Sequence, residues 1–271
     1  MVIRNDNSRT SLRTRRRVRV VGTLTLLMAC GATLVAAQTR VGQPASGSAL
    51  RTSWGEPDLT GVWGGVDLTA RPGKDALNLA QLERLYRADA RPKELSAKDD
   101  PGLKCLPQAF PRAALLGQPI QIVQRPGLLV VLTEAFHTFR TIPTDNRPHP
   151  TDFLFPMYLG NSTGRWDNDT LVVDVTSFNG ESWLANATDK PAASSRGVWP
   201  TSDMLHVAER WRRTGADTLE CEATVDDPAM LTGQWKTPKI VFKRQTRNRI
   251  DVGKCFVDDP ATVPPKVAAA R

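Results

Sequence analysis

The chain after residue 119 follows the two-residue alternation of apolar and polar positions that is typical of β-strands. Turn signals rich in Gly, Pro, Asn and Asp separate the apolar segments. We predict strands at 61–66, 120–124, 128–142, 170–176, 204–213, 218–225, 239–245 and 249–257. Short turns between successive strands favour antiparallel neighbours. The predicted fold is therefore mainly β, an up-and-down antiparallel barrel or a sandwich of about eight strands.

One short helix is expected before these strands. Its apolar face consists of Leu79, Leu82, Leu85 and Tyr86. Asn78 is placed to cap this helix, and Gln81 follows three residues later, as in a capping box. Residues 91–119 contain five prolines and are predicted to be irregular.

The first 37 residues read as an export signal. A basic stretch that ends in three arginines precedes an apolar segment at 20–37, and small residues stand before an expected cleavage after Ala37. An uncleaved membrane anchor is one alternative, and lipoprotein processing at Cys30 is another. The expected location is the periplasm or the medium, with 38–57 as a linker and 58–271 as a single β-rich domain.

Most of the net charge belongs to this leader. The whole chain has 36 Lys and Arg against 28 Asp and Glu, a net charge of +8. Residues 1–37 carry seven arginines and one acid, so the remaining 234 residues carry only +2. Residues 38–271, with a net charge this close to zero, lack the excess of basic residues that is typical of nucleic-acid-binding proteins. We therefore expect no nucleic-acid partner, and membrane contact only through the N-terminal segment.

Three cysteines remain after the leader. Export permits disulfides, so one bridge is expected among Cys105, Cys221 and Cys255, and the three pairings stay open. No pair has C-x-x-C spacing, and the three histidines show no metal-binding spacing. We predict neither a metal site nor a cofactor.

Two sequence features suggest catalysis on local grounds. Residues 160–164 match G-x-S-x-G, but a turn and a strand follow Ser162 where a nucleophile elbow needs a helix, so a polar loop is the better interpretation. His149 lies between two prolines that hold its backbone extended, which makes it a candidate acid–base residue, with a surface role as the alternative.

Two carboxylates fall on apolar strand faces. In 128–142 the face of Leu128, Val130, Leu132 and Phe136 also carries Glu134 and Arg140. In 204–213 the face of Leu205, Val207 and Trp211 carries Glu209, while His206 falls on the opposite face. A buried carboxylate requires a partner, so Glu134 and Glu209 are either ion-paired to an inward arginine such as Arg140 or are pocket acids poised for proton transfer.

Several motifs resemble known proteins. Residues 61–63 are similar to the G-x-W signature of lipocalin-like barrels, although a tryptophan is common in any β core. The segments WGEPDLTGVW at 54–63, DNRPHP at 145–150, GRWDNDTLVVD at 164–174 and HVAER at 206–210 together resemble a large group of uncharacterised exported bacterial proteins. That resemblance implies a secreted β-rich domain and no particular activity. The polar positions that it marks are Glu134, His149, Arg165, Asp167, Asp169, Asp174, Asn179 and Glu209.

Three hypotheses of function follow. The first is an exported barrel that binds a small, partly apolar organic molecule in its interior, with Arg140, Arg165, Asp174 and Asn179 as binding residues and His149, Glu134 and Glu209 as candidate catalytic residues. The second is an enzyme on the same scaffold that performs lyase, isomerase or hydrolase chemistry by acid–base catalysis. The third is a structural envelope module with a filled core and no pocket.

Overall fold

A computed structural model describes residues 50–64, 78–151, 155–186 and 197–251. All of them belong to one compact unit, Ala45–Arg271. The predicted leader, including Cys30, lies outside the described residues. No helix within the described ranges is long and apolar enough to cross a membrane.

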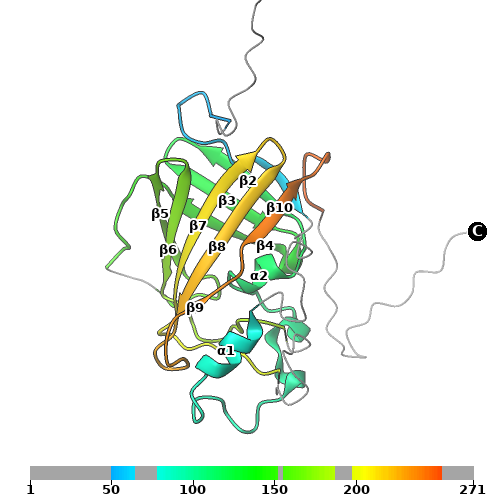
Figure 1. Cartoon of the computed structure of the whole chain (residues 1–271), viewed down its shortest axis with the longest axis vertical. Coiled ribbons are helices and arrows are strands. Elements are labelled where there is room, and N and C mark those ends of the chain that lie inside the picture. The colour runs from blue at the N-terminus through cyan, green and yellow to red at the C-terminus, as the bar shows by residue number, and fades with distance from the viewer. Residues whose placement is uncertain (1–49, 65–77, 152–154, 187–196, 252–271) are drawn as a thin grey trace, which may run out of the picture. The chain divides into compact units, whose positions relative to one another are not determined.

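The strands form a nearly closed antiparallel barrel, which confirms the predicted fold class (Figure 1). The strands are β1 Gly61–Gly64, β2 Ile120–Arg125, β3 Leu128–Thr133, β4 Thr138–Pro143, β5 Asn161–Asp167, β6 Thr170–Thr176, β7 His206–Gly215, β8 Thr218–Asp226, β9 Trp235–Lys236 and β10 Ile240–Arg244. Their order around the barrel is β4-β3-β2-β1-β10-β8-β7-β6-β5, and β9 pairs with β8 outside that path. Every neighbouring pair is antiparallel.

The path contains an odd number of strands, and this leaves a seam. Because direction alternates along nine strands, the first and the last, β4 and β5, run in the same direction. A tight hairpin cannot join parallel strands, and residues 144–160 form the connection between them. The two strands are the ends of the sheet and are not paired with each other.

Apolar side chains fill the barrel. On β7 and β8 every second residue is buried, as the period-two pattern predicts. The fully buried large side chains include Trp63, Ile122, Leu129, Ile142, Leu171, Leu219 and Phe242. Each such side chain contributes about 1.5–3 kcal/mol by leaving water. Trp63 of the G-x-W element is buried and donates its indole N–H to the Leu59 carbonyl at 2.9 Å.

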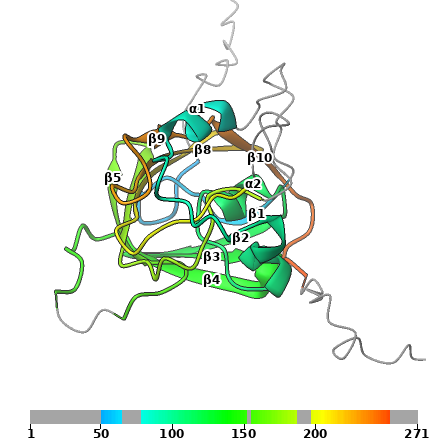
Figure 2. The same ribbon diagram turned by 90° about the horizontal axis from the view of Figure 1, so that it is seen from below.

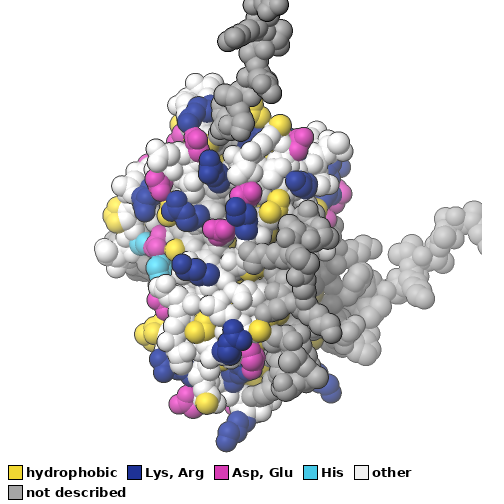
Figure 3. Space-filling model, in the orientation of Figure 1, with side chains coloured by type: hydrophobic (Ala, Val, Ile, Leu, Met, Phe, Trp, Pro, Cys, Tyr) yellow, Lys and Arg dark blue, Asp and Glu magenta, His cyan; other side chains and the backbone are white. Residues whose placement is uncertain are grey.

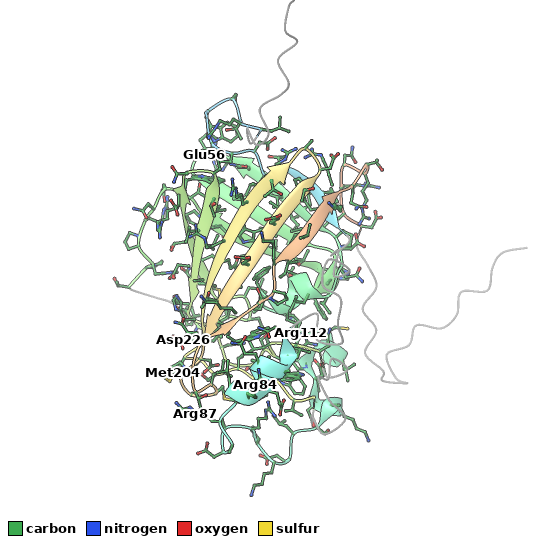
Figure 4. The ribbon with its side chains drawn as sticks, viewed as in Figure 1. Glu56, Arg84, Arg87, Arg112, Met204 and Asp226 are labelled. Atoms are coloured by element: carbon green, nitrogen blue, oxygen red, sulfur yellow. The ribbon has the colours of Figure 1, made fainter. Side chains whose placement is uncertain are left out.

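Helices cover one end of the barrel (Figure 2). They are α1 Leu79–Leu85, the 3-10 turns η2 Ala97–Asp99 and η3 Pro101–Lys104, and α2 Arg112–Leu115. Figure 4 places Arg112 of α2 near this end and Glu56 at the opposite end. Residues 91–119, which were predicted to be irregular, contain three of these elements: η2, η3 and α2.

The predicted helix is confirmed as α1, but its predicted capping box is wrong. Asn78 has a left-handed backbone (φ 56°) and makes no side-chain cap bond. Its amide instead donates to the Lys236 carbonyl at 3.1 Å and to the Gln81 side chain. Long-range contact with the strand region has replaced the local cap.

Three predictions about the strands need correction. The predicted strand 128–142 is two strands, β3 and β4, separated by a turn at η4 Ala135–His137, where Phe136 has φ 58° and His137 has φ 50°. The inward residues of β3 are Leu129 and Val131, not the predicted face of Leu128, Val130, Leu132 and Phe136. The second correction is β5, which occupies residues interpreted as a polar loop. Of the predicted strand 249–257, the described residues 249–251 are not in a strand.

Candidate functional site

The seam between β4 and β5 is closed at one point and open beyond it. An ideal Cβ on Gly164 of β5 would lie 3.0 Å from Ile142 Cγ2 and 3.2 Å from the Pro143 carbonyl oxygen, so the two strands meet there. A side chain here would be in tight contact with both atoms, and glycine avoids that contact. Asn146 also donates its backbone N–H to the Gly164 carbonyl at 3.1 Å.

A pocket of about 310 Å³ opens where the two strands are apart, and we call it the wedge. It is lined by Pro107, Phe139, Arg140, Thr141, Met157, Tyr158, Leu159, Gly160, Asn161 and Ser162. Phe139 is 67% exposed and Met157 is 41% exposed. These two exposed apolar side chains give the pocket an apolar surface that a ligand could cover.

A second, smaller cavity lies deeper, and we call it the inner cavity. It has a volume of about 30 Å³ and shares Phe139, Arg140 and Leu159 with the wedge. Its other lining residues are Gln108, Phe110, Ala113, Ala114, Ile120, Val131, Thr133, Thr138 and Trp211. This volume suffices for one water-sized group.

Arg140 and Glu209 form an ion pair beside the inner cavity. Arg140 Nη1 and Nη2 donate to Glu209 Oε1 at 2.5 Å and Oε2 at 2.8 Å, and Trp211 Nε1 donates to Oε2 at 2.8 Å. The side chains are 11% and 0% exposed. Burial acts to lower the pKa of Arg140, but the charge and hydrogen bonds of Glu209 outweigh burial and hold that pKa above its ordinary value. Of the two interpretations offered for Glu209, the geometry supports the ion pair.

Two buried polar atoms on the lining have no hydrogen-bond partner among the described residues. They are Gln108 Oε1 and Ser162 Oγ. Gln108 faces the inner cavity and Ser162 faces the wedge. Buried polar atoms in native proteins are usually paired, so these two atoms are available to hydrogen-bond a ligand.

Glu134 does not share the inner face with Glu209, which corrects its predicted place on an inward strand face. On β3 the inward residues are Leu129 and Val131, so the alternation that puts Thr133 on the inner cavity turns Glu134 away from it. Glu134 Oε2 accepts from Arg247 Nη2 at 2.8 Å and from the Asp251 backbone N–H at 3.1 Å. Neither the wedge nor the inner cavity includes Glu134.

Asp174 joins two histidines on the outer face of the barrel. Its Oδ2 is 2.9 Å from His149 Nε2 and its Oδ1 is 2.7 Å from His206 Nε2. A carboxylate only accepts, so each imidazole donates its Nε2 proton. His149 Nδ1 also lies 2.7 Å from Asn161 Oδ1, which fastens the 144–151 segment to β5. On the face shown in Figure 3, histidine side chains lie among acidic and basic ones.

The two histidines change the titration of Asp174. Burial acts to raise the pKa of this carboxyl, but the hydrogen bonds from His206 and His149 outweigh burial and lower the pKa below its ordinary value of 3.8. The carboxylate is 46% exposed, so solvent screens much of this interaction.

The Asp174→Asn variant tests this linkage. A carboxyl with a lowered folded-state pKa contributes stability that is present above pH 3.8 and lost as the pH falls through the folded value. We expect the variant to lower the free energy of unfolding at pH 7 by about 1 kcal/mol or less. Thermal unfolding of both proteins from pH 7 to pH 2 should show this difference shrinking below pH 3.8. Asp89→Asn, at an exposed position without a described hydrogen bond, should show no such change. A difference that is constant with pH would contradict the linkage.

The remaining predicted site residues are dispersed. Arg165 is exposed and lines an outer cleft of about 240 Å³ together with Asp174. Asn179 accepts a backbone hydrogen bond from Glu181 at 3.1 Å and shapes its own turn. Among these predicted binding residues only Arg140 lies in the wedge.

The cysteines limit the disulfide alternatives. Cys105 is disulfide-bonded, and Cys221 is free and buried. Both pairings that include Cys221 are therefore excluded, and the partner of Cys105 lies outside the described residues. Burial raises the pKa of the Cys221 thiol well above its ordinary value.

Sequence reasoning missed Gln108 and the exposure of Phe139. Gln108 lies in a proline-rich segment without a periodic pattern, so no local signal marks it. Ser162 could have been recognised as inward-facing by pairing 161–167 with the strand at 170–176, where Ser162 opposes the buried Val175. The expected absence of a nucleophile elbow agrees with the fold, since Ser162 lies within β5 and strand β6 follows.

Comparison of the chain with protein-family models, with curated protein sequences and with solved structures finds no match.

Proposed function

We propose that the protein binds a small, partly apolar organic molecule in the wedge between β4 and β5. This places the ligand at the seam of the barrel and not along its axis, where the core side chains are packed. The unpaired Ser162 hydroxyl on a mainly apolar pocket wall is the observation that carries the proposal.

The size and lining of the wedge support this function. Ligand pockets usually have a volume of about 300–1,000 Å³, apolar walls and a few convergent polar groups. The wedge, at about 310 Å³, lies at the lower end of this range. It combines Phe139, Met157 and Leu159 with the polar groups of Arg140 and Ser162.

A mass-spectrometric screen of the purified protein against small-molecule pools tests the proposal. The Thr141→Trp variant fills the wedge from an exposed position on β4, and we expect it to weaken binding of retained compounds by at least about tenfold, or 1.4 kcal/mol. Val123→Trp is the matched control, because Val123 is an exposed strand residue of β2 outside the lining. Equal binding by the wild type and Thr141→Trp would refute the wedge as the site.

Acid–base catalysis is the second candidate function. It is favoured by Asp174, whose carboxylate orients two imidazoles from distant parts of the chain, as carboxylates orient catalytic histidines. The same screen detects it as new product masses. Loss of product in Asp174→Asn and in His149→Ala would support this function, and undiminished product in both variants would refute it.

The place of action is part of the proposal. The basic and apolar leader supports export to the periplasm or the medium. Such a protein would meet small molecules outside the cytoplasm.

A further inference from the structure

We propose that the ligand of the wedge is an uncharged molecule with an apolar ring and a hydroxyl group, such as a phenol or an aryl alcohol, whose hydroxyl enters the inner cavity. This inference rests on the proposed binding function and specifies the class of ligand. It follows from charge balance, from the hydrogen-bonding groups that line the inner cavity, and from the volumes of the two spaces.

Charge balance favours an uncharged ligand. Among the described residues that line the wedge and the inner cavity, Arg140 is the only charged one. Its charge is neutralised by Glu209, which accepts two hydrogen bonds from Arg140 and one from Trp211. A carboxylate ligand would therefore find no free positive charge, and an ammonium ligand would find no free carboxylate. Burying an uncompensated charge costs several kcal/mol.

The inner cavity offers a ligand one unpaired acceptor and one charged donor group. Gln108 is 1% exposed, and its Nε2 donates to the Leu106 carbonyl at 2.8 Å, which fixes the amide so that Oε1 is the unpaired atom. Oε1 can only accept. Arg140 can only donate, and within the described residues its guanidinium hydrogen bonds go to Glu209 alone. A hydroxyl satisfies both partners, since its proton goes to Gln108 and its oxygen accepts from Arg140.

Other polar groups of the inner cavity do not compete for this role. The Thr133 hydroxyl bonds the Thr138 hydroxyl and lies 3.1 Å from the Thr138 carbonyl. The two threonines therefore satisfy each other, and Gln108 with Arg140 set the polarity that a ligand meets.

The two volumes divide the ligand into a small polar tip and a larger apolar body. The inner cavity, at about 30 Å³, suffices for one hydroxyl-sized group, while the wedge, at about 310 Å³, accommodates a ring. Phe139 lines both spaces, so a ring in the wedge has an aromatic wall, and Phe110 and Trp211 line the inner cavity. Phe110 and Trp211 have ring centroids 5.2 Å apart, and the Arg140 guanidinium lies 5.7 Å from the Phe110 centroid. Aromatic ligands pack well against such walls.

A panel of matched compounds tests the ligand class. Calorimetric titration of the purified protein would compare 4-ethylphenol with ethylbenzene, 4-ethylanisole, 4-ethylbenzoate and 4-ethylbenzylamine. We expect the phenol to bind at least about tenfold tighter than each of the others, because only it is uncharged and retains the donating hydroxyl. The Gln108→Met variant keeps side-chain length but removes the acceptor. It should reduce the preference for phenol over ethylbenzene, measured as a ratio within the variant, to less than about threefold.

The outcomes separate the ligand class from the binding function. Tighter binding of the benzoate or the benzylamine would overturn the uncharged class, and equal binding of phenol and ethylbenzene would overturn the hydroxyl; in both cases wedge binding would stand. The wild-type ranking decides these points even if Gln108→Met does not fold. If no panel compound binds but the earlier screen yields a ligand lost in Thr141→Trp, only the class is wrong. If neither experiment yields a ligand, both proposals fail.

Discussion

Replacing Arg140 with methionine is expected to lower the free energy of unfolding by about 3–5 kcal/mol, because Glu209 would then be a buried charge without its partner. Equilibrium unfolding in urea, followed by tryptophan fluorescence and circular dichroism, measures this loss. No other cation contacts Glu209 among the described residues.

A double variant separates the buried charge from lost packing. Arg140→Met with Glu209→Gln removes both charges and keeps an oxygen that can accept from Trp211 Nε1. We expect it to recover about 2 kcal/mol of the loss. Arg51→Met, which breaks the exposed pair with Asp169, is the control and should cost less than about 1 kcal/mol. Equal losses in the buried and the exposed pair would contradict the assigned role of Glu209.

Replacing Gly160 with alanine is expected to cost about 2–4 kcal/mol, from backbone strain and overpacking together. Gly160 has φ 65°, which L residues other than glycine rarely adopt. A Cβ there would lie 2.7 Å from the Thr176 carbonyl oxygen and 2.8 Å from Val175 Cγ1. These atoms belong to the packed sheet and have little room to move.

Gly127→Ala is the matched control for Gly160→Ala. Gly127 has a similar φ of 71°, but a Cβ there would meet no atom within 4 Å. Only the backbone strain remains, about 1 kcal/mol. Thermal and urea unfolding of the two variants should therefore differ by about 1 kcal/mol or more. Equal destabilisation would show that the wall of the wedge at Gly160 is loosely packed.

Much of the fold could be predicted because strand alternation is a local property. Strand 170–176 has the predicted bounds, and Glu209 faces inward while His206 faces outward, as the period of two requires. The prediction was wrong for Glu134, because Leu129 and Val131, and not their even-numbered neighbours, face inward on β3. Phe136 and His137, which have positive φ, then break the alternation, so that Arg140 on β4 lies on the inner side, and nothing in their side chains signals that conformation.

The site was less predictable because its parts come from distant segments. The sequence offered Arg140 as one partner for an inward carboxylate, and the structure confirms the Arg140–Glu209 pair. Gln108 lines the inner cavity together with Arg140, but it lies in a proline-rich segment whose sequence has no periodic pattern that predicts this position. Asp174 meets His149 and His206, which lie 25 and 32 residues away along the chain, only because β5, β6 and β7 are neighbours.

The sequence by itself determined the class of the fold and which faces of most strands are buried, since backbone geometry and hydrophobic burial act residue by residue. Only the tertiary structure decided that nine strands form the barrel and that the two strands at its seam, β4 and β5, run in the same direction. Strand count and pairing order depend on long-range contacts that no local pattern encodes. That seam opens a pocket beside a neutralised ion pair, where Gln108 Oε1 and Ser162 Oγ have no hydrogen-bond partner among the described residues.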